Sequence, residues 1–79
     1  MHFDVEAIVT KATDTELKLT GNWPLAWLQA PQSTQIQRKL RPGEAFESVW
    51  EQTQRSEIGG NRANWPDLRV GDRVIVRCF

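Results

Sequence analysis

Hydrophobic and polar side chains alternate at the start of the chain, and this alternation predicts a β-hairpin. Apolar residues occupy every second position from Phe3 to Val9, with Ile8 as the one exception on the polar face. A period of two is typical of a half-buried strand. Short polar side chains at 13–15 favour a turn, and Leu17 and Leu19 then alternate with polar residues as a second strand. Residues 3–20 are therefore expected to form a hairpin.

The same alternation returns over residues 73–79. Val74, Val76 and Cys78 are expected to face inward, while Arg73 and Arg77 face outward. The Gly71-Asp72 pair favours a tight turn before this β-branched strand. The pattern predicts a final strand here.

The middle of the chain is less regular. Pro24 begins an apolar run that ends at Leu28, and a proline marks the start or the edge of a strand because it cannot donate to a ladder. A further strand is predicted over 34–40, with Ile36 and Leu40 on the inner face. Arg38 falls between those two residues on the same face, which weakens this prediction.

Residues 42–58 fit two interpretations. Apolar side chains recur there at helical spacing, Pro42 suits a first helical turn, and Gly59-Gly60 would end the helix. The alternative is a strand that places Phe46, Ser48 and Trp50 on one face. We favour the helix, because Glu51 and Arg55 would then form an i, i+4 pair in the stabilising order.

Together these elements predict a mainly β fold in one domain, residues 1–79. A chain of 79 residues has room for one modest core. The order of elements favours a small, partly open OB-like barrel with one short helix. The alternatives are an SH3-like barrel or an α+β roll.

The segment Leu68-Arg69-Val70-Gly71-Asp72-Arg73-Val74-Ile75-Val76 resembles the strand entry of ribosomal S1-type and initiation-factor-one-type OB domains. The opening strand, turn and second strand are similar in outline to those domains. The resemblance covers the first hairpin and the last strand. It implies an OB fold and an RNA-binding role. The chain departs from the pattern, since it has neither a Gly-rich first strand nor a highly basic surface.

Composition narrows the class of protein further. Ten Lys and Arg balance ten Asp and Glu, which argues against nucleic-acid binding by bulk charge, although the last third is basic and the first third acidic. No apolar run has the roughly 20 residues of a membrane span, and no signal peptide is expected. Cys78 is the only cysteine, which fits a cytoplasmic, reducing location.

The sequence contains no pattern typical of an enzyme or of a cofactor site. One histidine, His2, and one cysteine cannot form a zinc site. Glu44, Glu47 and Glu51 are best interpreted as a solvated helix face, and Cys78 as a buried structural thiol. We therefore expect a non-catalytic protein without metal or cofactor.

Tryptophans and basic residues are the candidates for binding. Trp23 and Trp65 each precede a proline in a predicted loop and could stack on bases, whereas Trp27 and Trp50 are expected in the core. The candidate basic residues, which could instead form ordinary solvated faces, are Arg38, Lys39, Arg41, Arg62, Arg69, Arg73 and Arg77.

Two functions follow from these candidates. The first is binding of single-stranded DNA or RNA through the loop tryptophans and a local basic face. The second is a protein-interaction module, such as an adaptor, an inhibitor or an assembly subunit, because Trp and Arg are enriched in interface hot spots. Oligomerisation through an open sheet edge belongs to the second class. No membrane partner is expected.

Overall fold

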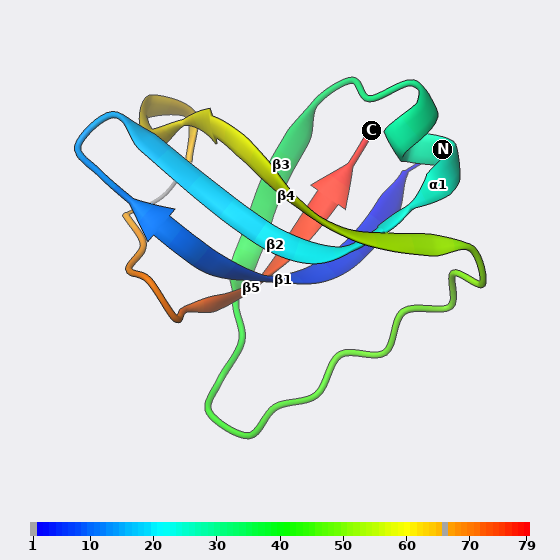
Figure 1. Ribbon diagram of the computed structural model, residues 1–79. Coiled ribbons are helices and arrows are strands. Elements are labelled where there is room, and N and C mark those ends of the chain that lie inside the picture. Colours follow the sequence, from blue (N-terminus) through cyan, green and yellow to red (C-terminus); the bar gives the residue numbers. More distant parts are fainter. Residues whose placement is uncertain (1, 66) are drawn as a thin grey trace.

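The chain forms one antiparallel five-stranded sheet with a single short α-helix (Figure 1). The computed structural model describes residues 2–65 and 67–79. Its elements are β1 (Phe3–Ala12), β2 (Glu16–Pro24), α1 (Leu25–Gln29), β3 (Thr34–Lys39), β4 (Thr53–Asn61), a 3₁₀ turn (Arg62–Asn64) and β5 (Arg73–Cys78). The strand order is β3-β5-β1-β2-β4, so β3 and β4 are the two edges. The prediction of a mainly β fold with one short helix is confirmed, and the sheet is not closed into a barrel, because the edge strands β3 and β4 do not pair with each other.

The predicted hairpin is formed by β1 and β2. The hydroxyl of Thr13 accepts the backbone N–H of Glu16 at 3.0 Å, and the N–H of Thr13 donates to the Glu16 carbonyl at 2.9 Å. The short polar side chain thus closes the turn, as its residue type predicts. Val5 and Leu19 are buried on the face that the alternation assigns to the core.

The final strand pairs with β1 on one side and with β3 on the other. The β1–β5 register runs from Phe3 opposite Cys78 to Ile8 opposite Arg73, so the two ends of the chain lie together (Figure 1). The β3–β5 register shifts between Ile36 and Arg38. This bulge explains why Arg38 does not interrupt the inner face: the extra residue re-phases the strand and leaves Arg38 exposed.

One face of the sheet carries the core. Its buried members are Val5, Ala7, Val9, Leu17, Leu19, Trp23, Trp27, Leu68, Val74, Val76 and Cys78. The indoles of Trp23 and Trp27 lie 5.8 Å apart between ring centroids. The indole N–H of Trp23 donates to the Ser56 carbonyl at 2.8 Å, while that of Trp27 is buried with no partner among the described residues. The core therefore consists almost wholly of apolar contacts.

The favoured helix over 42–58 is wrong. Residues 44–50 have no regular secondary structure, and Thr53–Asn61 form β4, which includes the glycines that were expected to end a helix. The helical spacing was misleading because its apolar residues do not share one environment: Val49 is 79% exposed, whereas Trp50 is half-buried. The α-helix lies instead at Leu25–Gln29, within the apolar run after Pro24.

Candidate binding groove

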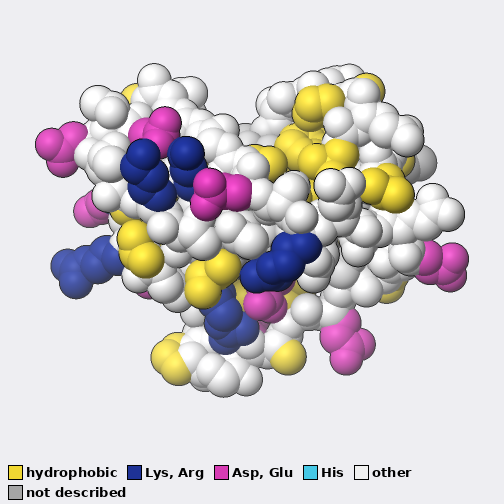
Figure 2. Space-filling view, viewed as in Figure 1, with side chains coloured by type: hydrophobic (Ala, Val, Ile, Leu, Met, Phe, Trp, Pro, Cys, Tyr) yellow, Lys and Arg dark blue, Asp and Glu magenta, His cyan; other side chains and the backbone are white. Residues whose placement is uncertain are grey.

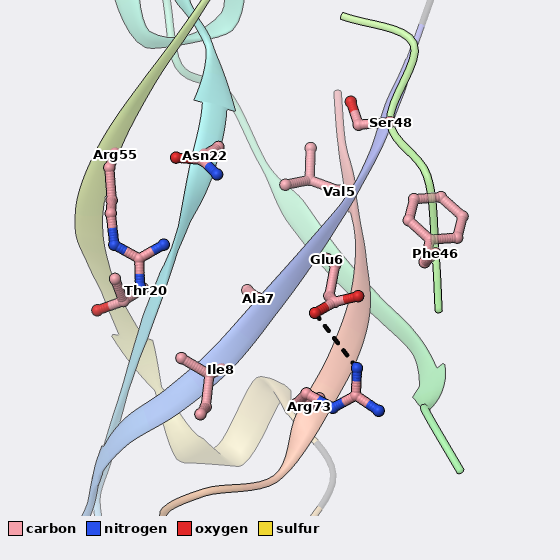
Figure 3. Close-up of a pocket in the computed structure, with 10 residues that line it drawn as sticks. All are labelled: Val5, Glu6, Ala7, Ile8, Thr20, Asn22, Phe46, Ser48, Arg55 and Arg73. Atoms are coloured by element: carbon pink, nitrogen blue, oxygen red, sulfur yellow. Dashed lines mark hydrogen bonds and ion pairs between the residues drawn. The ribbon is translucent and has the colours of Figure 1, made fainter. Parts of the chain in front are cut away.

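The outer, polar face of the sheet contains a groove of about 450 Å³ (Figure 3). Its floor is formed by β1 and β2, its sides by β4, β5 and the segment 40–52 that connects β3 to β4. The residues that line it are Val5, Glu6, Ala7, Ile8, Thr20, Asn22, Phe46, Ser48, Arg55 and Arg73. Because side chains alternate along a strand, Glu6, Ile8, Thr20 and Asn22 fall between the core positions of β1 and β2. Val5 and Ala7, by contrast, are buried core residues that also border the groove.

Two arginines lie on opposite sides of the groove and differ in their partners. Nη1 of Arg73 lies 3.5 Å from Oε2 of Glu6, and its Nη2 donates to the Arg41 carbonyl at 3.2 Å. Arg55, on β4, has no ion-pair partner among the described residues and lies along the far side of the groove (Figure 3). The groove therefore holds two cations and one carboxylate, and its excess positive charge is at Arg55.

The wall formed by residues 40–52 is held at both ends. Near its start, Arg38 donates two hydrogen bonds to Glu44, at 3.0 and 2.6 Å, and the Arg41 N–H donates to the same carboxylate at 2.8 Å. These donors lower the pKa of Glu44 to about 2. Near its end, Trp50 packs edge-on against Phe3 with ring centroids 4.7 Å apart. Phe46 and Ser48 lie between these anchors and face the groove (Figure 3).

The basic stripe predicted on the last strand is largely neutralised. Arg77 forms two hydrogen bonds with Asp4, at 2.9 and 3.1 Å, and Arg73 pairs with Glu6. The guanidinium of Arg77 lowers the pKa of Asp4 below its ordinary value. The acidic residues of β1 thus lie beside the arginines of β5. Ile75, which lies between these two arginines on β5, is only 7% exposed.

The basic cluster Arg38-Lys39-Arg41 is divided among three environments. Arg38 is paired with Glu44, and Nζ of Lys39 lies 3.2 Å from Asp72. Arg41 lies just after β3, in the connection to β4, and has no ion pair among the described residues. Two of its three charges are therefore already balanced within the chain.

The predicted tryptophan contacts also change. Trp23 is fully buried at the end of β2, so its expected position in a polar loop is wrong. Trp65 is half-buried against β4, and a Cβ placed on Gly60 would lie only 2.9 Å from its ring. Gly60 therefore provides the space that this indole fills. Trp27 is buried as predicted, and Trp50 packs against the edge of the core.

A second, more open hollow of about 500 Å³ contains the remaining predicted residues. It is lined by Ala12, Thr13, Asp14, Arg62, Asp67, Leu68, Arg69 and Val70. Arg62 is tied to three partners: the carbonyls of Thr13 and Leu68, and the carboxylate of Asp67 at 2.6 Å. Arg69 has no ion pair among the described residues. Arg62 is therefore held within the chain, whereas Arg69 and the carboxylate of Asp14 are the two charged groups of this hollow without an ion pair among the described residues.

Of the residues that line the groove, sequence reasoning proposed only Arg73 for binding and missed the others, Asn22, Phe46 and Arg55 among them. Arg55 was assigned to a helix as the partner of Glu51, and this error concealed its position on the outer face of a strand. The alternation of Arg55 and Glu57 with the half-buried Ser56 and Ile58 is the signal that identifies β4.

No family model, curated protein or solved structure matches this chain. The resemblance to OB-type domains therefore stays a prediction. No helix among the described residues is long and apolar enough to cross a membrane. Within residues 2–65 and 67–79, no three His, Cys, Asp or Glu side chains gather where they could hold a metal ion.

Proposed function

We propose that this chain is a non-catalytic protein-interaction module whose groove binds an extended, acidic segment of another protein. Arg55 carries the proposal, because it is a cation without an ion-pair partner among the described residues on the side of a preformed groove. A carboxylate can form charge-assisted hydrogen bonds with it. Phe46 and Ile8 add apolar surface for a neighbouring side chain. The segment we expect therefore carries an Asp or Glu next to an aliphatic residue.

The charge distribution favours a protein partner over a nucleic acid. Among the described residues, seven ion pairs use seven different Lys or Arg side chains of the ten in the chain. Basic and acidic side chains are interspersed on the face in Figure 2, without a continuous basic track. Binding along a phosphate backbone needs several cations free to replace counterions. An acidic peptide segment that places one carboxylate at the groove requires only one such cation, Arg55.

The proposed absence of catalysis is supported by the state of the single thiol. Cys78 is fully buried, and burial raises its pKa to about 12, so the thiolate needed for nucleophilic attack does not form near neutral pH. A single reduced cysteine also supports the cytoplasm as the proposed location.

Single-stranded nucleic acid is the second candidate, favoured by the presence of Phe46 and Arg55 in the same groove. An aromatic ring and a guanidinium can receive one base and one phosphate. Trp65 packs on Gly60 and Trp23 is buried, so this version of the proposal rests on Phe46 in place of the loop tryptophans.

The test compares three labelled probes by fluorescence anisotropy: a peptide of alternating Glu and Val, its Lys–Val counterpart, and a single-stranded oligonucleotide. We expect saturable binding of the Glu–Val peptide alone. Arg55→Ala should weaken it about tenfold, the usual effect of losing one charge-assisted hydrogen bond. Arg69→Ala is the matched control, since Arg69 also has no ion pair among the described residues but lies outside the groove.

Each other outcome has a definite meaning. Binding of the oligonucleotide that weakens with salt and with Arg55→Ala would replace the first candidate with the second. Equal binding of both peptides, or equal losses in the Arg55 and Arg69 variants, would overturn the role of the groove.

A further inference from the structure

The outer edge of β4 is long and regular. The strand pairs with β2 at nine successive positions, from Glu16 opposite Asn61 to Pro24 opposite Thr53, without a register shift. It is the last strand in the order, so its other side has no neighbour within the sheet. A row of unpaired N–H and C=O groups on such an edge is a template for another strand.

Two hydrogen bonds at the ends of the β2–β4 ladder show which residues of β4 direct their backbone N–H and C=O groups to the free side. The N–H of Leu25 donates to the Gln52 carbonyl at 3.0 Å, and the N–H of Arg62 donates to the Thr15 carbonyl at 3.0 Å. Hydrogen-bonded positions alternate along an antiparallel strand. The even-numbered residues from 52 to 62 therefore direct their backbone N–H and C=O groups toward β2. The odd-numbered residues, Arg55 and Glu57 among them, therefore direct their backbone groups outward.

The other edge of the sheet lacks these properties. β3 has six residues, contains the bulge between Ile36 and Arg38, and ends in the adjacent charges of Arg38 and Lys39. Short length and a bulge both discourage strand addition, whereas the two charges add little because Arg38 is paired with Glu44 and Lys39 with Asp72. The two edges thus differ, and β4 is the one suited to pairing.

We propose that two copies of this chain pair through their β4 edges, antiparallel, about a twofold axis at Ser56. In this register Arg55 lies opposite Glu57 of the second copy, and the symmetry repeats the pair on the other side of the axis. The outward backbone groups of both residues also meet, as a hydrogen-bonded pair requires. Oppositely charged residues directly across two strands stabilise their pairing.

The alternative registers are less favourable for the same physical reason. An axis at Glu57 places the two Glu57 carboxylates opposite each other, and a parallel in-register pair places Arg55 opposite Arg55. Glu57 accepts a hydrogen bond from Thr10 at 2.6 Å, and its second oxygen lies 3.9 Å from Lys18, a long contact that leaves it available. Of these three arrangements, charge favours the axis at Ser56.

A single strand pair makes a small interface, below about 1,200 Å², so the dimer is expected to be weak and concentration-dependent. Sedimentation velocity over a range of protein concentrations measures it. Arg55→Glu and Glu57→Arg each place like charges across the axis twice and should raise the dissociation constant about tenfold or more. The double variant R55E/E57R restores opposite charges and should recover the dimer to within about threefold of the parent chain.

Hydrogen exchange at individual amides provides a second measurement. Raising the protein concentration should protect the amides of Arg55 and Glu57, whereas those of Gln54 and Ser56, already bonded to β2, should stay protected at every concentration. Circular dichroism of each variant verifies that it is folded. A monomer at millimolar concentration, a double variant no better than the single ones, or protection confined to β3 would overturn the proposal.

The dimer does not depend on the proposed peptide function, although both use Arg55, and the double variant separates the two. It restores the charge pair at the edge but leaves an acidic residue at position 55 in the groove. Dimer recovery with loss of Glu–Val peptide binding supports both proposals. Dimer recovery in a chain that never binds the peptide refutes the peptide function alone, and peptide binding by a chain that never dimerises refutes the dimer alone.

Discussion

Trp23 and Trp27 offer a paired test of the core, because they differ in whether the indole N–H has a partner. Trp23 donates to the Ser56 carbonyl at 2.8 Å, and the Trp27 N–H is buried without a partner among the described residues. Replacing either with Phe removes a similar volume, so the packing costs largely cancel in the comparison. The change in hydrogen bonding then decides the difference.

The expected magnitudes follow from the cost of each polar group. Trp23→Phe loses a hydrogen bond worth about 1 kcal/mol, whereas Trp27→Phe removes a buried, unsatisfied donor that costs about 1–3 kcal/mol. Trp23→Phe should therefore be less stable than Trp27→Phe by about 2 kcal/mol or more. For a domain of this size, that difference corresponds to about 10 °C in Tm.

The stability of each variant is measured by urea and thermal unfolding. Unfolding is followed by circular dichroism, because each substitution removes a tryptophan and so changes the fluorescence signal itself. Far-ultraviolet spectra of both variants should match the parent chain, and equal m-values would show that the unfolded states are comparable. An equal decrease in the free energy of unfolding in the two variants, or a greater decrease in Trp27→Phe, would refute the reasoning. Such a result would mean that ring packing outweighs the indole hydrogen bonds.

Three further predictions concern other parts of the molecule. Gly60→Ala should destabilise the fold by about 1–3 kcal/mol in urea unfolding because its methyl would press on a tryptophan ring 2.9 Å away, while Gly59→Ala, with 3.7 Å to its nearest neighbour, should not. Cys78 should react with a thiol reagent in a colorimetric assay only as the protein unfolds, since burial raises its pKa to about 12. Arg38 holds the pKa of Glu44 at about 2, so the stabilisation from their ion pair is present above about pH 4.5 and is lost as the pH falls toward 2. Glu44→Gln should therefore lower Tm at pH 7 but not at pH 2. An equal decrease in Tm at both pH values would refute this.

Alternation predicted the parts of the fold in which one face is buried and the other is solvated. The β1–β2 hairpin and β5 follow this rule, and Val74, Val76 and Cys78 are fully buried as expected. β3 was also predicted, and its bulge resolves the apparent conflict at Arg38. In these segments the local pattern and the tertiary environment agree.

The segment 42–58 could not be predicted because distant residues determine its structure. Trp50 packs against Phe3 and Phe46 lines the groove on the outer face, positions that no local pattern indicates. Residues from Thr53 onward adopt a strand because β2 offers a free edge. The groove forms only when both segments are in place, so its residues within 42–58 could not be predicted from the sequence. The ion pairs that neutralise Arg73 and Arg77 likewise depend on the β1–β5 register.

The position of β5 between β1 and β3 has a consequence for folding. β3 has no partner in the sheet other than β5, and β1 meets β5 through pairs as distant as Phe3 with Cys78. During synthesis, the hairpin and β4 can pair with one another before residues 73–78 leave the ribosome, but β3 cannot join the sheet until they do. Pairing of such distant segments has a high contact order and is intrinsically slow. The folding chain therefore exposes the apolar face of β1 and β2 until β5 pairs with β1, and such an exposed face is prone to aggregation.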